Sequence, residues 1–305
     1  MSVSADSSRT AAGLIRNATL IAGPTASGKS ALAVRLARAS GALIINADSM
    51  QVYDVLRVVT ARPGEADVEQ APHRLYGHVA PTMAFSTGSW LRDVAALAAR
   101  EGDRPLIFVG GTGLYFRGLV EGFAEMPAIP SHIRDRWRYK LHEEGPDKLH
   151  RILRAEDPKM AAVLRPGDGQ RIVRALEVLE TSGRSISEWQ ADSRPALIDR
   201  VSASFRVIEP DRAVLVERIN RRFDRMVEDG ALDEVAALLA LDPDPAVPAM
   251  KAIGVRELGE VLAGRMPLAD AIERAKIATR QYARRQSTWF RNQFGPEWRR
   301  ISGFE

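Results

Sequence analysis

The residues best suited to chemistry lie in one glycine-rich segment near the start of the chain. Residues 23–30 read Gly-Pro-Thr-Ala-Ser-Gly-Lys-Ser, which fits the phosphate-loop pattern G-x-x-x-x-G-K-[ST] at every constrained position. The backbone N–H groups of such a loop surround phosphates, and the N-terminus of the following helix adds partial positive charge. Lys29 would then neutralise phosphate oxygens, and the Ser30 hydroxyl would bind Mg²⁺. The pattern does not identify the phosphates that are held.

Polar residues follow two further apolar stretches of the chain. Residues 42–46 lead into Asp48, and residues 105–109 lead into a second glycine-containing turn that carries Thr112. Ligands of parallel α/β sheets bind just beyond the carboxyl ends of strands. We therefore expect the phosphate loop, Asp48 and Thr112 to line one cleft. Asp48 could be a metal-water ligand, a general base or a helix cap, and Thr112 could donate to a phosphate oxygen or cap a turn.

Hydrophobic periodicity predicts an α/β fold with a central parallel sheet flanked by helices, together with a small all-helical insert. Short buried strands are expected at residues 18–22, 42–46, 105–109 and 204–208. Helices are expected at residues 30–38, from Ser86 or Thr87 to about 100, from a capping Ser131, at 170–179 with a stop at Gly183, after a capping Asp211, and at 267–292, with helices continuing to the end of the chain.

Residues 126–130 contain prolines and resemble a linker, and residues 131–194 show helix patterns alone. We therefore expect a flexible tail at residues 1–16, a phosphate-loop core at 17–122 and 200–305, and a helical insert at 123–199. The segment 57–81 has no clear periodicity and is expected to be loop with short elements.

Composition excludes several classes of protein. The 305 residues include no cysteine, so disulfides, thiolate catalysis and cysteine metal sites are excluded, and five scattered histidines leave little room for a zinc site. No apolar run is long enough to span a membrane. Residues 1–16 lack the apolar core of a secretory signal, so a cytoplasmic protein is expected. The net charge of +4 is only mildly basic.

Basic residues gather on two predicted helices. The insert carries Arg134 with three further cations nearby, and Gln170 and Arg174, four apart, share one helix face. On the last helix Lys276, Arg280 and Arg284 step by four with almost no acid after Glu273, which favours phosphate contact over plain solvation. From the residues alone, the default is a small-molecule or nucleotide kinase with an arginine-bearing lid. Such a kinase needs an acidic residue to bind Mg²⁺, and Asp48 is the one good candidate. The residues that follow it, Ser-Met-Gln, are unusual for a plain metal site.

The chain resembles the tRNA dimethylallyltransferases, bacterial enzymes that prenylate the adenosine just 3′ of the anticodon. Segments that carry the resemblance span nearly the whole chain in family order. They are residues 23–30 (GPTASGKS), 48–53 (DSMQVY), 60–63 (TARP), 110–115 (GGTGLY), 170–177 (QRIVRALE), 251–258 (KAIGVREL) and 279–291 (TRQYARRQSTWFR). The phosphate loop alone is shared with many families, whereas the whole set is close to diagnostic.

The resemblance implies that the phosphate loop holds the diphosphate of dimethylallyl diphosphate and not a nucleotide. Its diphosphate-binding residues would be Gly23, Pro24, Thr25, Ala26, Ser27, Gly28, Lys29 and Ser30. Catalysis would fall to Lys29, Asp48 and Thr112: Lys29 and Thr112 would stabilise the leaving diphosphate, together with Mg²⁺ on Ser30, and Asp48 would act as general base toward the exocyclic N6 amine of adenosine.

The resemblance also implies tRNA as a partner, with the helical insert gripping the anticodon loop. The tRNA contacts would come from Asp48, Ser49, Met50, Gln51, Thr112, Arg134, Gln170, Arg171, Ile172, Val173, Arg174, Lys251, Arg256, Arg284 and Arg291. A monomer without membrane association is expected. The alternatives are a phosphate-loop kinase, a prenyltransferase acting on free adenine nucleotides, which would need no basic insert, and a non-enzymatic RNA-binding protein, which would need neither Lys29 nor Asp48.

One loop departs from the family pattern. After its tyrosine the family usually reads Gly-Met-Asp-Ile-Gly-Thr-Ala-Lys-Pro, whereas residues 55–63 here read Val-Leu-Arg-Val-Val-Thr-Ala-Arg-Pro. Both glycines are replaced, and Arg62 stands in place of lysine. Smaller departures are Phe85-Ser86 for a common Tyr-Ser and Gly254-Val255 for a common Gly-Tyr. None of them touches Lys29, Ser30, Asp48 or Thr112.

Overall fold

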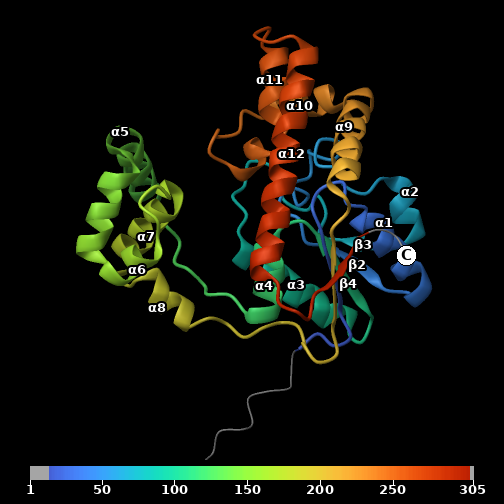
Figure 1. Cartoon of the computed structure of the whole chain (residues 1–305), viewed down its shortest axis with the longest axis horizontal. Helices are drawn as coiled ribbons and strands as arrows, with labels where there is room; N and C mark the ends of the chain where they lie inside the picture. The colour runs from blue at the N-terminus through green and yellow to red at the C-terminus, as the bar shows by residue number, and fades with distance from the viewer. Residues whose placement is uncertain (1–13, 303–305) are drawn as a thin grey trace, which may run out of the picture. The chain divides into compact units, whose positions relative to one another are not determined.

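The structure is a computed structural model that describes residues 14–302 (Figure 1). The described chain divides into two compact units. The core unit comprises the residues up to Val120 and those from Leu197 on, and the helical unit comprises Glu121–Ala196. These bounds lie within three residues of those expected for the core and the insert. Most of the expected tail, residues 1–13, lies outside the described residues.

The core unit contains a six-stranded sheet in which every neighbouring pair is parallel, in the order β3-β2-β4-β1-β5-β6. The strands are β1 (Thr19–Ala22), β2 (Leu43–Asn46), β3 (His73–Arg74), β4 (Leu106–Gly110), β5 (Ser204–Ile208) and β6 (Arg299–Ile301). The registers place Ala22 beside Gly110 and Val207. Consequently the segments that follow β1, β4 and β5 all begin at the same edge of the sheet.

Helices of the core unit flank this sheet, and four of them begin within one residue of the predicted start. They are α1 (Lys29–Ser40), α2 (Glu65–Gln70), α3 (Thr87–Glu101), α4 (Gly113–Glu121, whose last residue lies in the helical unit), α9 (Arg212–Glu228), α10 (Ala231–Ala240), a 3-10 turn (Pro248–Lys251), α11 (Val255–Leu262) and α12 (Leu268–Gln293). Ser86 caps α3 by accepting from the N–H of Ser89, and Asp211 caps α9, which confirms both predicted caps.

The helical unit has a hydrophobic core of its own. Its helices are α5 (Ser131–Glu156), α6 (Pro158–Val163), α7 (Gly169–Ser182) and α8 (Ile186–Ala191), and its buried residues include Trp137, Leu149 and Ile172. Gly183 ends α7 in the left-handed region at φ 67°, as predicted. The predicted cap at Ser131 is wrong: Pro130 occupies the cap position, and Ser131 is the first helical residue.

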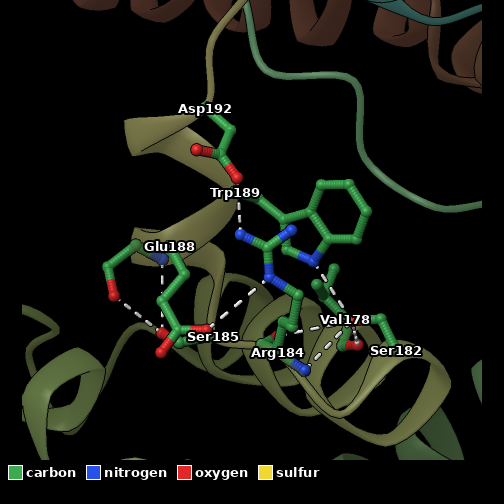
Figure 2. A network of polar contacts seen from close by, with 8 residues as sticks. Val178, Ser182, Arg184, Ser185, Glu188, Trp189 and Asp192 are labelled. Carbon is green, nitrogen blue, oxygen red and sulfur yellow. Dashed lines mark hydrogen bonds and ion pairs between the residues drawn. The ribbon is translucent and has the colours of Figure 1, made fainter.

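Figure 2 shows how the corner between α7 and α8 is held. Arg184 donates to the Asp192 carboxylate at 2.6 Å, and its guanidinium lies 4.7 Å from the ring centre of Trp189. The indole of Trp189 donates to Ser182 at 3.1 Å. Since its charge is paired and its planar face is covered, Arg184 serves the fold of this unit.

Two short edge strands escaped the sequence prediction. Helices do not continue to the end of the chain, because β6 pairs with β5, and β3 lies in the segment expected to be mainly loop. Both are two or three residues long and rich in charge, as edge strands often are, so neither forms an apolar run. Among residues 14–302, no helix combines the length and apolarity needed to cross a membrane.

Candidate active site

The phosphate loop connects β1 to α1 in the geometry that its glycines require. Gly28 precedes the helix at φ 94°, a left-handed conformation that side chains rarely adopt. A Cβ on Gly23 would lie 2.7 Å from the hydroxyl oxygen of Ser27. The Nζ of Lys29 folds back and donates to the carbonyl of Pro24 at 3.2 Å. These contacts place the ammonium group against the loop and at the N-terminus of α1.

Two arginines from α9 donate hydrogen bonds to this loop, and neither was predicted from the sequence. Arg222 donates to the hydroxyl of Thr25 at 3.3 Å, and Arg218 donates to the carbonyl of Ser27 at 3.4 Å. Their spacing of four residues, on the helix after β5, is the signal that could have revealed them, because β5 ends at the same edge of the sheet as β1.

The electrostatics of the loop favour an anionic ligand. Burial lowers the pKa of Lys29 to about 8; the Asp48 carboxylate acts against this shift, and the Arg222 guanidinium adds to it. Burial also lowers the pKa of Arg222, again opposed by Asp48. Two crowded cations thus share one carboxylate, and a bound polyanion would relieve both their desolvation and their mutual repulsion.

Asp48 is fixed by a backbone turn that follows β2. Asn46 accepts from the N–H of Asp48 at 2.8 Å and donates to the carbonyls of Asp48 and Leu75 at 2.9 and 3.0 Å. One carboxylate oxygen of Asp48 accepts from the N–H of Met50 at 3.0 Å. The other lies 3.2 Å from where a Cβ on Gly111 would be. The carboxylate is therefore oriented while remaining partly exposed.

Thr112 lies beside this turn at the start of α4. Its hydroxyl accepts from the N–H of Ser49 at 2.9 Å and donates to the Ser49 hydroxyl at 3.2 Å. A Cβ on Gly110 would lie 2.0 Å from the carbonyl oxygen of Ala47, so glycine is required where these two segments meet. Ser49 and Thr112 consequently form a hydroxyl pair next to Asp48.

A cleft of about 720 Å³ unites most of these groups within the core unit. Polar residues that line it include Lys29, Ser30, Asp48, Gln51, Arg62, His73 and Arg222. The phosphate loop and Asp48 therefore lie in one cleft, as the sequence predicts, whereas Thr112 is not among the residues that line it and bonds to Ser49. Burial lowers the pKa of His73, and burial followed by the charge of Asp48 raises the pKa of Tyr76 and Tyr115.

The loop at residues 55–63 closes another side of this cleft. Glu234 of α10 accepts from the backbone N–H groups of Arg57, Val58 and Val59 at 2.6, 2.7 and 2.8 Å. Gln51 donates to the carbonyls at positions 60 and 61, both at 2.9 Å. Without the usual glycines, the loop is thus held by side chains. The amide nitrogen of Gln51 is engaged with this loop, and the expected tRNA contact of Gln51 stays a prediction.

The residues expected to contact tRNA differ in their exposure. In the core unit Ser49 and Met50 are half-buried, whereas Lys251, Arg256, Arg284 and Arg291 are exposed. In the helical unit Gln170 and Arg171 are exposed, and Arg134 and Arg174 are half-exposed. Ile172 and Val173 are 0% and 5% exposed within the core of their own unit, so their side chains cannot contact RNA. They lie between polar residues in the sequence because they form part of the buried face of α7.

The expected basic stripe on α12 is wrong for Lys276, and Arg280 is partly engaged by α9. Lys276 is 9% exposed and pairs with Asp224 at 2.7 Å and Glu273 at 3.0 Å, while Arg280 donates to Asn220 at 2.6 Å. Two of its three members therefore bind α9 or their own helix. Helical spacing alone could not reveal this, because the partners come from a helix distant in sequence.

Comparison with known proteins decides the family. Residues 51–293 match the family model described as IPP transferase, and residues 16–80 match one described as Isopentenyl transferase. The tRNA dimethylallyltransferase of Mesorhizobium japonicum is 62% identical over 291 residues, which cover 95% of this chain and 90% of that protein. The chain belongs to the tRNA dimethylallyltransferase family. That of Agrobacterium fabrum is 57% identical, with 93% of this chain and 96% of that protein covered.

Solved structures of the family share the α/β fold. The tRNA isopentenylpyrophosphate transferase of Bacillus halodurans has a TM-score of 0.65 at 31% identity and covers 94% of this chain and 91% of its own. A eukaryotic dimethylallyltransferase acting on tRNA has a TM-score of 0.75 at 28% identity, with coverages of 93% and 73%. These matches confirm the predicted parallel sheet flanked by helices.

Proposed function

We propose that this chain transfers the dimethylallyl group of dimethylallyl diphosphate to the exocyclic N6 amine of the adenosine 3′ of the anticodon in tRNA. The observation that carries the proposal is the shared cleft of the phosphate loop and Asp48, in a chain of this family. The allylic carbon–oxygen bond breaks, a carbon–nitrogen bond forms, diphosphate leaves, and the amine loses one proton.

Diphosphate is a poor leaving group unless its developing charge is neutralised. The N–H groups of the phosphate loop, Lys29 and Arg222 supply that stabilisation, and Arg218 adds a further positive charge beside Ser27. The lowered pKa of Lys29 supports this role. Burial disfavours its charged form, and a bound diphosphate would stabilise that charged form.

Asp48 accepts the proton or a hydrogen bond from the weakly nucleophilic amine. Its orientation by Asn46 and Met50 supports this assignment, because a general base must lie within hydrogen-bonding reach of the group that it deprotonates. Tyr76 and Tyr115 remain neutral, since their pKa values are raised. Thr112 and Ser49 hold their hydroxyl groups next to Asp48 through their mutual hydrogen bonds.

The residues present fit Mg²⁺ bound through substrate phosphates. Among residues 14–302, no group of three or more acidic or histidine side chains could form an all-protein cage. Magnesium usually keeps several waters and binds through a few protein oxygens and phosphates, so the Ser30 hydroxyl and the diphosphate would hold it. When bound, the ion would neutralise charge on the leaving group.

The tRNA contacts stay predictions for the exposed and half-exposed polar residues of each unit. In the helical unit they are Arg134, Gln170, Arg171 and Arg174, and in the core unit Lys251, Arg256, Arg284 and Arg291. The target base must leave its stack to reach the Asp48 carboxylate in the cleft, which costs a few kcal/mol. Cytoplasmic location and a monomeric state also stay predictions.

The proposal is tested by diphosphate release. The purified chain is mixed with Mg²⁺ and dimethylallyl diphosphate, with and without unmodified tRNA, and diphosphate is measured by a coupled enzyme assay. We expect release that requires tRNA, and no hydrolysis of ATP in a parallel reaction. Release with AMP in place of tRNA would favour the prenyltransferase for free nucleotides, and ATP hydrolysis without prenyl transfer would favour a kinase.

A further inference from the structure

Gln286 of α12 is a buried amide for which the proposed mechanism has no use. It is 6% exposed, although glutamine is rarely buried unless its amide is satisfied. We infer that Gln286 is a positioning residue that holds the phosphate loop in register with the turn carrying Thr112. The inference rests on the proposed function, and it adds a residue that contacts neither substrate.

The amide of Gln286 joins two segments that leave neighbouring strands. Its oxygen accepts from the N–H of Thr25 at 2.9 Å, and its nitrogen donates to the carbonyl of Gly111 at 2.9 Å. Thr25 follows β1 and Gly111 follows β4, and the ladder between these strands ends at the pair Ala22 and Gly110. Gln286 therefore continues the pairing of the two segments where the sheet can no longer do so.

This bridge lies directly behind the reacting groups. A Cβ on Gly111 would lie 2.1 Å from the amide nitrogen of Gln286 and 3.2 Å from a carboxylate oxygen of Asp48. Gly111 is consequently packed between the two side chains, and Thr112 is the next residue. A shift of Gln286 would therefore displace Gly111, and with it the neighbouring Thr112 and the contact with Asp48.

The anchor of the bridge is itself rigid. Tyr282, one turn earlier on α12, forms a hydrogen bond with the Gln286 side chain, and Phe290, one turn later, is fully buried. Phe290 stacks on Phe294 with ring centres 5.1 Å apart. The helix thus presents the amide from a fixed position, as a positioning residue requires.

Transfer needs the allylic carbon, held through the diphosphate, to meet an amine that is oriented by Asp48. A displacement of about 1 Å between reacting groups can lower a rate by about 100-fold. Gln286 affects this separation alone and not the affinity for either substrate. Its loss should therefore lower kcat while leaving the KM for dimethylallyl diphosphate and the Kd for tRNA nearly unchanged.

The test is Gln286→Met, which keeps the volume and removes the hydrogen bonds to Thr25 and Gly111, with Gln281→Met on the exposed face of the same helix as control. For Gln286→Met we expect kcat to fall roughly 10- to 100-fold, with KM and Kd changed less than about threefold. Gln281→Met should match the unmodified chain. If Gln286→Met fails to fold by circular dichroism, Gln286→Glu takes its place, since it keeps the acceptor for Thr25 and loses the donor to Gly111.

Each outcome bears on a distinct claim. A folded Gln286→Met with normal kcat, or with a loss confined to KM or thermal stability, overturns the positioning role and leaves the proposed function intact. If the unmodified chain itself transfers no prenyl group, the proposed function fails, and the role of Gln286 fails with it. Partial recovery of kcat in Gln286→Glu relative to Gln286→Met would assign part of the effect to the bond with Thr25.

Discussion

Lys29 and Arg222 both interact with the carboxylate of Asp48 in a cleft that Asp67 and Asp229 also line. Burial costs both cations part of their hydration, and the Asp48 carboxylate returns only some of that free energy. A diphosphate carries several negative charges in a small volume, so it would stabilise the two cations, which a neutral ligand could not do. At the scale of the residue, the cleft is organised around a substrate anion.

The pKa of Lys29 predicts how activity depends on pH. Because this pKa is about 8, the side chain is charged below pH 8 and loses its charge as the pH rises through that value. Phosphate groups, with a second pKa near 6, are already fully ionised there. We expect kcat/KM for dimethylallyl diphosphate to fall above about pH 8, and Lys29→Arg, which stays charged, to lack this fall. A flat profile to high pH in the unmodified chain would refute the assignment.

Asp48→Asn should separate chemistry from binding. Asparagine keeps the oxygen that accepts from Met50 but cannot take a proton, so we expect transfer to fall about 10²- to 10⁴-fold while tRNA binds nearly as before. The control is His73→Gln, which alters another titratable side chain of the same cleft. Single-turnover rates measured with bound tRNA compare the two. A large loss in His73→Gln with normal transfer in Asp48→Asn would make histidine the base.

At the scale of the element, the site is made by the carboxyl ends of parallel strands. The loops after β1, β2 and β4 supply the phosphate loop, Asp48 and Thr112, and α9 brings two arginines to the same edge. Glu234 of α10 holds the loop at 55–63 against the cleft. Three charge-assisted bonds to the backbone replace the conformational freedom that glycines would have given.

Glu234→Gln should loosen this loop. The neutral amide has one acceptor oxygen where the carboxylate has two, so at least one backbone N–H loses its partner. We expect the free energy of unfolding to fall by about 2 kcal/mol, measured by urea denaturation, and the KM for dimethylallyl diphosphate to rise. Asp233→Asn, an exposed neighbour, serves as control. Equal stability and KM in both variants would mean that Glu234 does not hold the loop.

Sequence patterns were sufficient for the parts of the fold that local physics decides. Short apolar runs placed β1, β2, β4 and β5, and a capping aspartate and a glycine stop placed the ends of α9 and α7. The phosphate loop and Asp48 were found for the same reason, since both directly follow such runs.

The residues that were missed or misjudged are defined by partners far along the chain. Gln286 reads as a core residue of α12 until Thr25 and Gly111 are seen beside it. Lys276 reads as part of a basic surface until Asp224 is seen to pair with it. Periodicity reports which face of a helix is apolar, and it carries no information about which distant element covers that face.

At the scale of the whole molecule, the chain combines two compact units, each with its own hydrophobic core. The reacting groups all belong to the core unit. On α7 the helical unit carries the exposed Arg171 and the half-exposed Arg174, which pair with Asp168 and Glu177 of the same unit. Their contact with tRNA phosphates stays a prediction. The small net charge of +4 means that such contacts must come from local clusters.

Arg174→Gln should weaken tRNA binding and lower the slope of log K against log salt by about 1, because one phosphate contact is lost. Filter binding over a range of salt concentrations measures both. Arg184→Gln is the matched control in the same unit, since Figure 2 shows its charge engaged by Asp192. That variant should destabilise the corner without changing the slope. An unchanged slope in Arg174→Gln would count against phosphate contact there.

The most direct test of the account is to locate the product. Unmodified tRNA is incubated with the chain, Mg²⁺ and dimethylallyl diphosphate, cut into oligonucleotides by a ribonuclease and sequenced by tandem mass spectrometry. We predict a single dimethylallyl group on the adenosine 3′ of the anticodon. A group on another nucleotide would contradict the proposed acceptor, and intact tRNA that gains no mass while ATP is consumed would contradict the proposed chemistry altogether.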